Sequence, residues 1–225
     1  MLRLIAMKYC ESETTEASAF FGGSEEIKIP TSFMFYLIIS GERKILVDVG
    51  CEDMCGWPAY HYIKPVDLLR KYGVQPEDIT DVILTHSHFD HAGPIDYYAN
   101  AEFYIQTQEY VETDGDQKFA GKTVHLFEDE YLLCGRFLIK RIGGHSNNSC
   151  VVFFENNSVP YVLAGDEIYN QNNIDKQIPM GNAVNIVRNR DFIAMCKKKC
   201  LKAFSCHSYD FLIGNNGYQV LIEDI

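Results

Sequence analysis

Residues 85–93 of the chain read Thr-His-Ser-His-Phe-Asp-His-Ala-Gly, which places four potential metal ligands within six consecutive positions. The stretch follows the apolar run Asp81–Leu84, which predicts a buried strand, and a helical pattern resumes behind it. A strand that ends in a tight loop directs its imidazoles and its carboxylate into one small volume. Imidazole nitrogen and carboxylate oxygen are the ligands that a zinc-like divalent ion prefers. A lone histidine would be interpreted as a surface group, but this spacing predicts a metal site with four ligands: His86, His88, Asp90 and His91.

Three later motifs place further ligands beside the ends of predicted strands. Gly143-Gly144-His145-Ser146 closes one strand with a flexible glycine loop, and Gly165-Asp166 follows the apolar run Tyr161–Leu163. Ser205-Cys206-His207 follows a long predicted helix. The sequence therefore predicts that three more side chains join the same metal site: His145, Asp166 and His207.

The hydrophobic pattern along the chain predicts more strand than helix. Strands are expected at Phe33–Ile39, Lys44–Val49, Asp81–Leu84, Glu102–Ile105, Arg136–Ile142, Cys150–Phe154, Val159–Ala164, Phe211–Ile213 and Tyr218–Ile222. Helices are expected at Pro65–Tyr72, Gly93–Asn100, Gln106–Thr113 and Ile186–Phe204. This order predicts an α/β (α+β) fold, in which outer helices face two mixed β-sheets. Because 225 residues suit one sizeable core, we expect a single domain over residues 1–225.

The composition argues against several classes of protein. A hydrophobic content of 47% and a charged content of 23% are typical of a globular chain and exclude disorder. A net charge of −11 argues against nucleic acid as a partner. Since no stretch resembles a targeting signal or a membrane span, the expected location is the cytoplasm. The eight scattered cysteines include no C-x-x-C pair and are interpreted as reduced thiols.

The order of the ligand motifs resembles a known family. THSHFDHAG, followed by GGHS, GD and a late histidine, is similar to the H-x-H-x-D-H…H…D…H pattern of the metallo-β-lactamase superfamily. The segment ILVDVG at Ile45–Gly50 also looks like that family, whereas Cys206 and Ser208 stand where many relatives have Gly and Asp. The resemblance implies an αββα sandwich with a dinuclear metal centre at one edge. It assigns His86, His88 and His145 to the first ion, Asp90, His91 and His207 to the second, Asp166 to the bridge and Asp48 to bracing the ligand loop.

The same resemblance implies the chemistry of a metal-dependent hydrolase. Two divalent ions lower the pKa of a shared water, so that a bridging hydroxide attacks an ester, lactone, thioester or amide carbonyl. Asp90 would orient this nucleophile and pass a proton to the leaving group. Zinc is the expected ion, while the nitrogen and oxygen ligands also admit manganese, iron, cobalt or nickel.

Tyr169 indicates one branch of the family. It follows Asp166 by three residues. In N-acyl homoserine lactonases a tyrosine at this place hydrogen-bonds the lactone carbonyl, and a phenol there can donate to a developing oxyanion. The alternative is an ordinary amphipathic residue at the rim of the site. We therefore expect a small-molecule ester or lactone as the partner, with hydrolysis of a thioester or another ester, or a non-catalytic metal-dependent binding domain, as the alternatives.

More than one role stays open for Phe20-Phe21, Cys51–Tyr62 and Asp48, and one further segment is interpreted as a loop. Phe20-Phe21 and Cys51–Tyr62 suit apolar walls for an acyl chain, and they equally suit core packing or the contact of a homodimer. Asp48 suits either a group that braces the ligands or a carboxylate in the turn at the end of a strand. The stretch Glu11–Lys28 has no clear period and is interpreted as a mobile loop near an opening.

Overall fold

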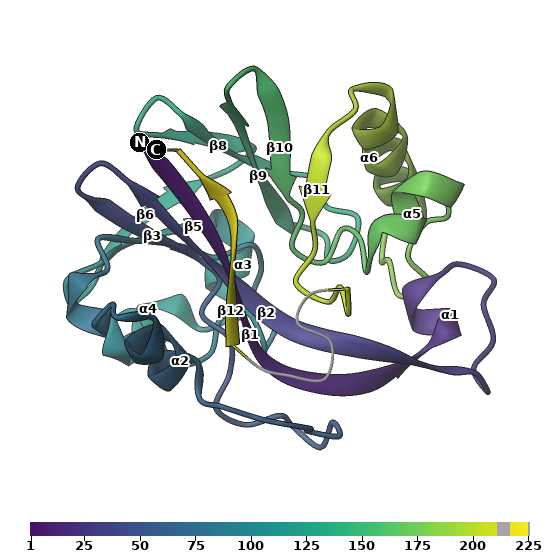
Figure 1. The fold of residues 1–225 in the computed structure, drawn as a ribbon, viewed down its shortest axis with the longest axis horizontal. Coiled ribbons are helices and arrows are strands. Elements are labelled where there is room, and N and C mark those ends of the chain that lie inside the picture. Colours follow the sequence, from purple (N-terminus) through teal and green to yellow (C-terminus); the bar gives the residue numbers. More distant parts are fainter. Residues whose placement is uncertain (211–216, 225) are drawn as a thin grey trace. The chain divides into compact units, whose positions relative to one another are not determined.

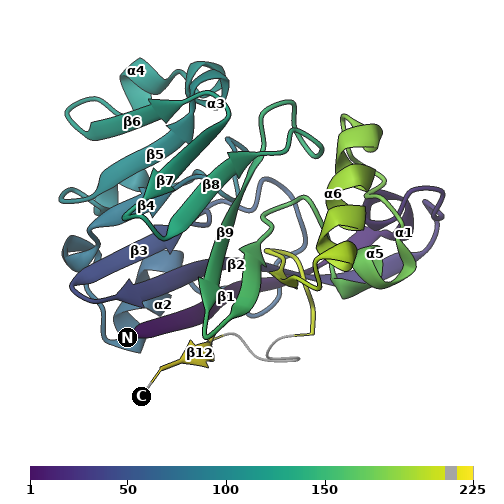
Figure 2. The same ribbon diagram turned by 90° about the horizontal axis from the view of Figure 1, so that it is seen from above.

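The computed structural model describes residues 1–210 and 217–224, and within them the strands form two mixed β-sheets. The first sheet has the strand order β12-β1-β2-β3-β4-β5-β6 (Figures 1 and 2; Figure 2 labels every strand of this sheet). Its strands are β1 (Leu2–Thr15), β2 (Lys28–Ser40), β3 (Arg43–Val47), β4 (Asp81–Ile83), β5 (Glu102–Gln106), β6 (Thr123–Phe127) and β12 (Gly217–Glu223). β4 pairs in parallel with β3 and β5, whereas β2 is antiparallel to β3 and β12 is antiparallel to β1.

The second sheet has the strand order β11-β10-β9-β8-β7 (Figure 1, which labels β8 to β11). Its strands are β7 (Glu130–Leu133), β8 (Phe137–Arg141), β9 (Cys150–Asn156), β10 (Val159–Leu163) and β11 (Lys202–Phe204). β10 pairs in parallel with β11, and the remaining pairs are antiparallel. Two mixed sheets with helices confirm the fold class predicted from the sequence.

The described chain groups into two compact units, each assembled from separate stretches. The first unit comprises Met1–Ser12, Ser32–Leu126 and the described residues from Tyr209 onward, and its helices are α2 (Pro65–Tyr72), α3 (Thr107–Glu112) and α4 (Gly115–Lys118). The second unit comprises Glu13–Thr31 and Phe127–Ser208, and its helices are α1 (Glu16–Ala19), α5 (Gln171–Lys176) and α6 (Ile186–Lys198). The single domain over residues 1–225 stays a prediction.

The core of the first unit forms around the parallel strands β3, β4 and β5. Leu46, Val82 and Phe103, one from each strand, are fully buried in one cluster with Leu68 of α2. Burial of each such side chain contributes about 1.5–3 kcal/mol, so this cluster holds the end of β4 in a fixed place. Helix α2 begins with a proline and is capped after Tyr72 by Gly73, whose φ of 96° is a left-handed conformation that glycine adopts without strain.

Two aromatic residues of the segment Cys51–Tyr62 pack against this core. The ring centroids of Trp57 and Phe33 lie 5.7 Å apart, and those of Tyr62 and Tyr9 lie 6.3 Å apart, both edge to face. These contacts support the interpretation of Trp57 and Tyr62 as core packing, while Tyr60 is 47% exposed.

The core of the second unit forms between β10 and the helices α5 and α6, which lie next to each other (Figure 2). Phe192 and Cys196 of α6 are buried against Val162 of β10 and Ile174 of α5. The side chain of Asn185 caps α6 by accepting a hydrogen bond of 3.1 Å from the Arg188 N–H. In the part of the chain that the structure describes, every helix is too short or too polar to span a bilayer.

Most of the expected elements are present. Each strand predicted between Phe33 and Ala164 overlaps an observed strand, α2 has both predicted ends, and α3 lies within the predicted helix Gln106–Thr113. The predicted strand Tyr218–Ile222 lies in β12. The predicted strand Phe211–Ile213 lies outside the described residues.

The interpretation of Glu11–Lys28 as a loop is wrong for its first half. Strand β1 continues to Thr15 and helix α1 follows directly, with the Thr15 side chain accepting a hydrogen bond of 3.0 Å from the Ser18 N–H. The strand is hard to detect because it carries polar side chains inside the protein. Lys8, for example, is fully buried and forms an ion pair with Glu11.

The helix predicted over Gly93–Asn100 is also wrong, since the structure has only a short 3₁₀ helix at Ile95–Tyr97. The Gly93 N–H donates to the Gly50 carbonyl (3.1 Å) instead of to the chain before it, and β5 begins two residues after Asn100. The Tyr98 N–H donates to the Ile95 carbonyl (3.1 Å), only three residues earlier, which is the hydrogen bond of a 3₁₀ helix and not of an α-helix.

The long helix predicted over Ile186–Phe204 is wrong in its last third. Helix α6 ends at Lys198, and Cys200 then adopts a left-handed conformation with φ 51°. The three residues Lys202–Phe204 form β11, which pairs in parallel with β10. A helical pattern cannot reveal this change, because the partner strand is distant in the sequence.

Candidate metal centre

The loop behind β4 is fixed by a buried carboxylate at the end of β3. Asp48 accepts hydrogen bonds from the Thr85 N–H (2.8 Å) and the Thr85 hydroxyl (2.9 Å), and its Oδ2 lies 2.7 Å from Nδ1 of His91. Asp48 is fully buried and has a φ of 62°. Since a carboxylate can only accept, His91 donates from Nδ1, and Nε2 of the neutral ring then carries the lone pair that a metal ion needs.

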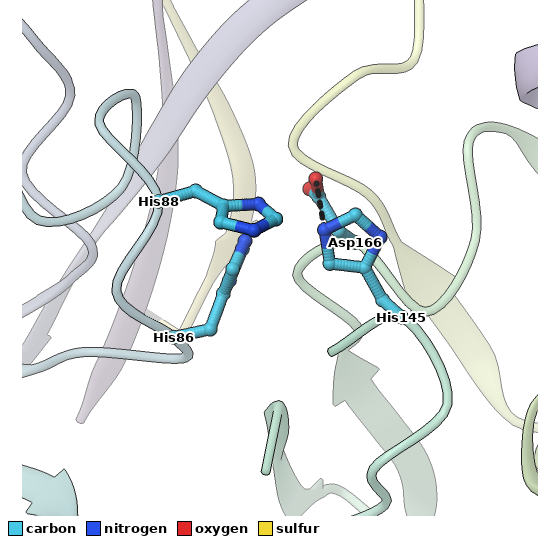
Figure 3. Close-up of side chains that lie close together, drawn as sticks. All are labelled: His86, His88, His145 and Asp166. Atoms are coloured by element: carbon cyan, nitrogen blue, oxygen red, sulfur yellow. Dashed lines mark ion pairs between the residues drawn. The ribbon is translucent and has the colours of Figure 1, made fainter. Parts of the chain in front are cut away.

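The histidines of this loop gather in the first unit. The His86 ring centroid lies 4.5 Å from that of His88 and 4.1 Å from that of His91 (Figure 3, which draws His86 and His88). His86 is fully buried and its Nδ1 lies 3.0 Å from the Thr85 hydroxyl, whereas His88 is exposed. Nε2 of His91 lies 3.4 Å from Oδ2 of Asp90. The structure therefore brings the four predicted ligands of THSHFDHAG together.

A second buried carboxylate holds the same loop from helix α3. Oε2 of Glu109 accepts hydrogen bonds from the Ser87 N–H (2.8 Å) and the Ser87 hydroxyl (2.5 Å). Ser87 stands between His86 and His88, so this carboxylate fixes the backbone that carries both rings. The sequence analysis missed Glu109, because it looks like any polar position on a short helix.

Two contacts fix the far end of the loop. The Tyr9 hydroxyl donates to the Asp90 carbonyl (3.2 Å), and the Lys118 ammonium donates to the Ala92 carbonyl. A side chain at Gly93 would place its Cβ 2.3 Å from the Gly50 carbonyl oxygen. Glycine is required here because any side chain would collide with the Gly50 backbone, and not because the backbone is left-handed.

The other three predicted ligands gather in the second unit. Nε2 of His145 lies 3.4 Å from Oδ2 of Asp166 (Figure 3), and Nε2 of His207 lies 3.1 Å from Oδ1 of the same carboxylate. All three side chains are buried. Asp166 thus lies between the two imidazoles.

The spacing of these donors fits a divalent ion. Two ligand atoms that lie about 2.1 Å from one ion at the tetrahedral angle are about 3.4 Å apart. The distances of 3.4 Å from His91 to Asp90, 3.4 Å from His145 to Asp166 and 3.1 Å from His207 to Asp166 are close to this value. Each unit therefore supplies nitrogen and oxygen donors at the separation that a metal site needs.

Tyr169 is buried in the second unit, and not at the rim of a site. Its ring stacks on that of His207, with centroids 4.9 Å apart and planes inclined by 20°. The Tyr169 hydroxyl lies 3.4 Å from the Thr14 hydroxyl, and the ring packs with Ala19 and Met180. The phenol is therefore held beside one of the predicted ligands.

The backbone around His207 is held by hydroxyl groups. The Ser205 hydroxyl accepts from the His207 N–H (3.0 Å) and lies within donating distance of the Ile168 and Tyr169 carbonyls, at 2.7 and 2.9 Å. The Thr31 hydroxyl donates to the His207 carbonyl (3.1 Å). These contacts place His207 without the Gly and Asp that many relatives carry around it.

Comparison with known proteins identifies the family of this chain. A family model described as the metallo-β-lactamase superfamily matches residues 34–189. The chain therefore belongs to the metallo-β-lactamase superfamily.

Its relatives include lactonases. The chain is 31% identical over 102 residues to the N-acyl homoserine lactonase AiiB of Agrobacterium fabrum, with 39% of this chain and 36% of that protein covered. It is 25% identical over 167 residues to an N-acyl homoserine lactonase of a Bacillus species, with 64% of this chain and 67% of that protein covered.

A solved structure has the same fold. An N-acyl homoserine lactone hydrolase, with the product N-hexanoyl-L-homoserine bound at its catalytic metal centre, superposes with a TM-score of 0.78. The two chains are 19% identical, and the match covers 91% of this chain and 92% of the other.

Proposed function

We propose that this protein is a metal-dependent hydrolase that opens a lactone or a similar small ester. The observation that carries the proposal is the set of imidazole and carboxylate donors in each unit at the separation that ligands of one ion have. The names of its relatives support a lactone as the substrate class. Hydrolysis of a thioester or another ester is the alternative reaction.

The ligand assignment follows the family pattern. His86, His88 and His145 would hold one divalent ion, Asp90, His91 and His207 the other, and Asp166 would be shared. The pair of ions would supply an activated water and polarise the substrate carbonyl. We propose zinc as the ion, and the same donors also suit manganese, iron, cobalt or nickel.

Asp90 would orient the attacking water and return a proton to the leaving group. Asp90 is buried, its backbone carbonyl accepts a hydrogen bond from the Tyr9 hydroxyl, and its carboxylate lies beside His91. A carboxylate placed in this way can accept a proton from water and donate it to the alkoxide that leaves. Asp48 would keep Nε2 of His91 free of its proton, so that this nitrogen can bind a metal ion.

Tyr169 would bind the substrate carbonyl. Its stacking on His207 holds the phenol next to the proposed ligands, and a phenol can donate a hydrogen bond to the developing oxyanion. Phe20 packs against the same cluster, and Phe21 is 61% exposed. We propose these two rings as a wall for the acyl chain of the substrate.

We expect the metal-loaded protein to hydrolyse an N-acyl homoserine lactone faster than an acyclic ester or a thioester with the same acyl chain. Replacing Tyr169 by phenylalanine should then lower the rate on the lactone on the order of a hundredfold, because one oxyanion donor is lost. Steady-state kinetics on the three substrates measures both effects.

Tyr209→Phe, which changes a tyrosine of the first unit, is the matched control and should keep the wild-type rate. An unchanged lactone rate in Tyr169→Phe would remove the argument for a lactone-binding tyrosine. A thioester or acyclic ester that reacts faster than the lactone would replace the proposed substrate class.

A further inference from the structure

Glu167, the residue directly after Asp166, is a fully buried carboxylate in the second unit. Its Oε1 accepts hydrogen bonds from the Gly144 N–H (2.9 Å), the His145 N–H (3.1 Å) and the Ser149 hydroxyl (2.6 Å). Its Oε2 accepts a hydrogen bond of 2.9 Å from the Asn189 amide. Four donors therefore converge on one carboxylate, and three of them belong to the loop that carries His145.

Asn189 connects this carboxylate to helix α6. Its amide nitrogen also donates to the Glu167 carbonyl (2.8 Å), and its oxygen accepts from the Met180 N–H (2.9 Å). The amide thus contacts both the side chain and the backbone of Glu167, which leaves neither free to shift without breaking a hydrogen bond.

The loop is shaped to receive the carboxylate. A Cβ at Gly144 would lie 2.3 Å from Oε2 of Glu167 and 2.8 Å from Cβ of Asn189. Glycine at this position therefore allows the backbone to approach the carboxylate closely enough for two consecutive N–H groups to reach it.

Burying a carboxylate to hold a loop is unfavourable in free energy unless its hydrogen bonds to water are replaced. Here the Ser149 hydroxyl, the Asn189 amide and two backbone N–H groups replace those hydrogen bonds. Well-packed apolar side chains often stabilise a protein as much as a buried charge does, so stability alone does not account for this one. The partners indicate a reason, because they include the backbone of a proposed ligand.

We propose that Glu167 is a positioning residue that fixes the imidazole of His145 for metal binding. Asp166 and Glu167 leave the same turn, in which Gly165 has a φ of 49° and the Glu167 N–H donates to the Ala164 carbonyl (2.9 Å). One residue of the turn is a proposed ligand and the next holds the backbone of another ligand. The separation of 3.4 Å between His145 and Asp166 is thereby fixed by a contact only one residue away.

This inference rests on the proposed function, and metal binding tests it independently of catalysis. In Glu167→Gln, the amide oxygen of the new side chain can still accept from the loop. Its NH₂ group, however, would face the NH₂ group of Asn189, so that two hydrogen-bond donors oppose each other. We expect this variant to bind Co²⁺ about 10–100-fold more weakly than the wild type in a competition with a chromophoric chelator. We also expect a changed visible absorption spectrum of the bound Co²⁺, since the geometry of the ligands changes.

Glu155→Gln, which changes an exposed carboxylate on β9, is the matched control and should keep the affinity and the spectrum of the wild type. Wild-type affinity and spectrum in Glu167→Gln would overturn the inference, even if the melting temperature of the metal-free variant falls, because the role would then be structural only.

If Glu167→Gln does not fold, Ser149→Ala decides, since it removes one donor to Glu167 and keeps the carboxylate. Weaker Co²⁺ binding with an altered spectrum supports the inference and unchanged binding overturns it, whereas a wild type that binds no Co²⁺ contradicts the proposed function itself.

Discussion

Replacing His88 by alanine is expected to lower lactone turnover by about a thousandfold or more while the protein stays folded. The loss follows from the proposed role of His88 as a ligand, because a metal ion contributes several kcal/mol to the stabilisation of the transition state and each 1.4 kcal/mol is about tenfold in rate. The fold should survive because His88 is exposed, and exposed substitutions usually change stability by less than about 0.5 kcal/mol. The melting temperature of the metal-free variant should therefore stay within about 2 °C of the wild type.

His125→Ala is the matched control for this experiment. His125 lies on β6, 2.8 Å from the Glu102 carboxylate and stacked on Tyr104, and it belongs to none of the ligand motifs. Its replacement should leave the turnover and the metal content unchanged. The assignment of His88 is wrong if His88→Ala retains the wild-type rate with its full complement of metal.

The second large effect is expected for Asp48→Asn. Asparagine tolerates the left-handed backbone at this position, so the substitution tests the carboxylate and not the conformation. The new NH₂ group would face Thr85 or His91, where the structure has only donors directed at a carboxylate. We expect a loss of about 1–3 kcal/mol in the free energy of unfolding, which is about 3–10 °C in melting temperature for a chain of this size.

Metal affinity should fall in the same variant, about 10–100-fold. An amide donor at position 48 favours the His91 tautomer that carries its proton on Nε2, and this tautomer cannot bind a metal ion through that nitrogen. Calorimetry and a metal titration measure the two effects. Asp67→Asn, on the exposed face of α2, is the control and should change neither. Wild-type metal affinity in Asp48→Asn would show that Asp48 serves only the turn at the end of β3.

The proposed ligands could be picked out from the sequence because their signal is local. THSHFDHAG follows one buried strand, GGHS and GD follow two others, and each motif can be recognised without its partners. Helix α2 was predicted at both ends for the same reason, since Pro65 and Gly73 lie at its own boundaries.

The residues that hold the ligands could not be predicted in this way. Glu109 and Glu167 each accept hydrogen bonds from a loop that lies 18 to 23 residues away, and nothing in their own neighbourhood distinguishes them from exposed carboxylates. Lys8 is fully buried in β1, so the sequence of this strand looks like that of a polar segment. Strand β11 depends on a partner strand about 40 residues earlier, since Ala203 pairs with Val162. The hydrophobic pattern of a segment indicates whether it forms a strand or a helix. It does not indicate which distant segments contact it, because those contacts depend on the fold.

The metal content of the protein tests the central claim most directly. Elemental analysis of the wild type, purified without chelators and without added metal, should find about two divalent ions per chain, because seven nitrogen and oxygen ligands are available to hold them. A protein that holds one ion or none, even after metal is added in excess, and still hydrolyses the lactone would contradict the account.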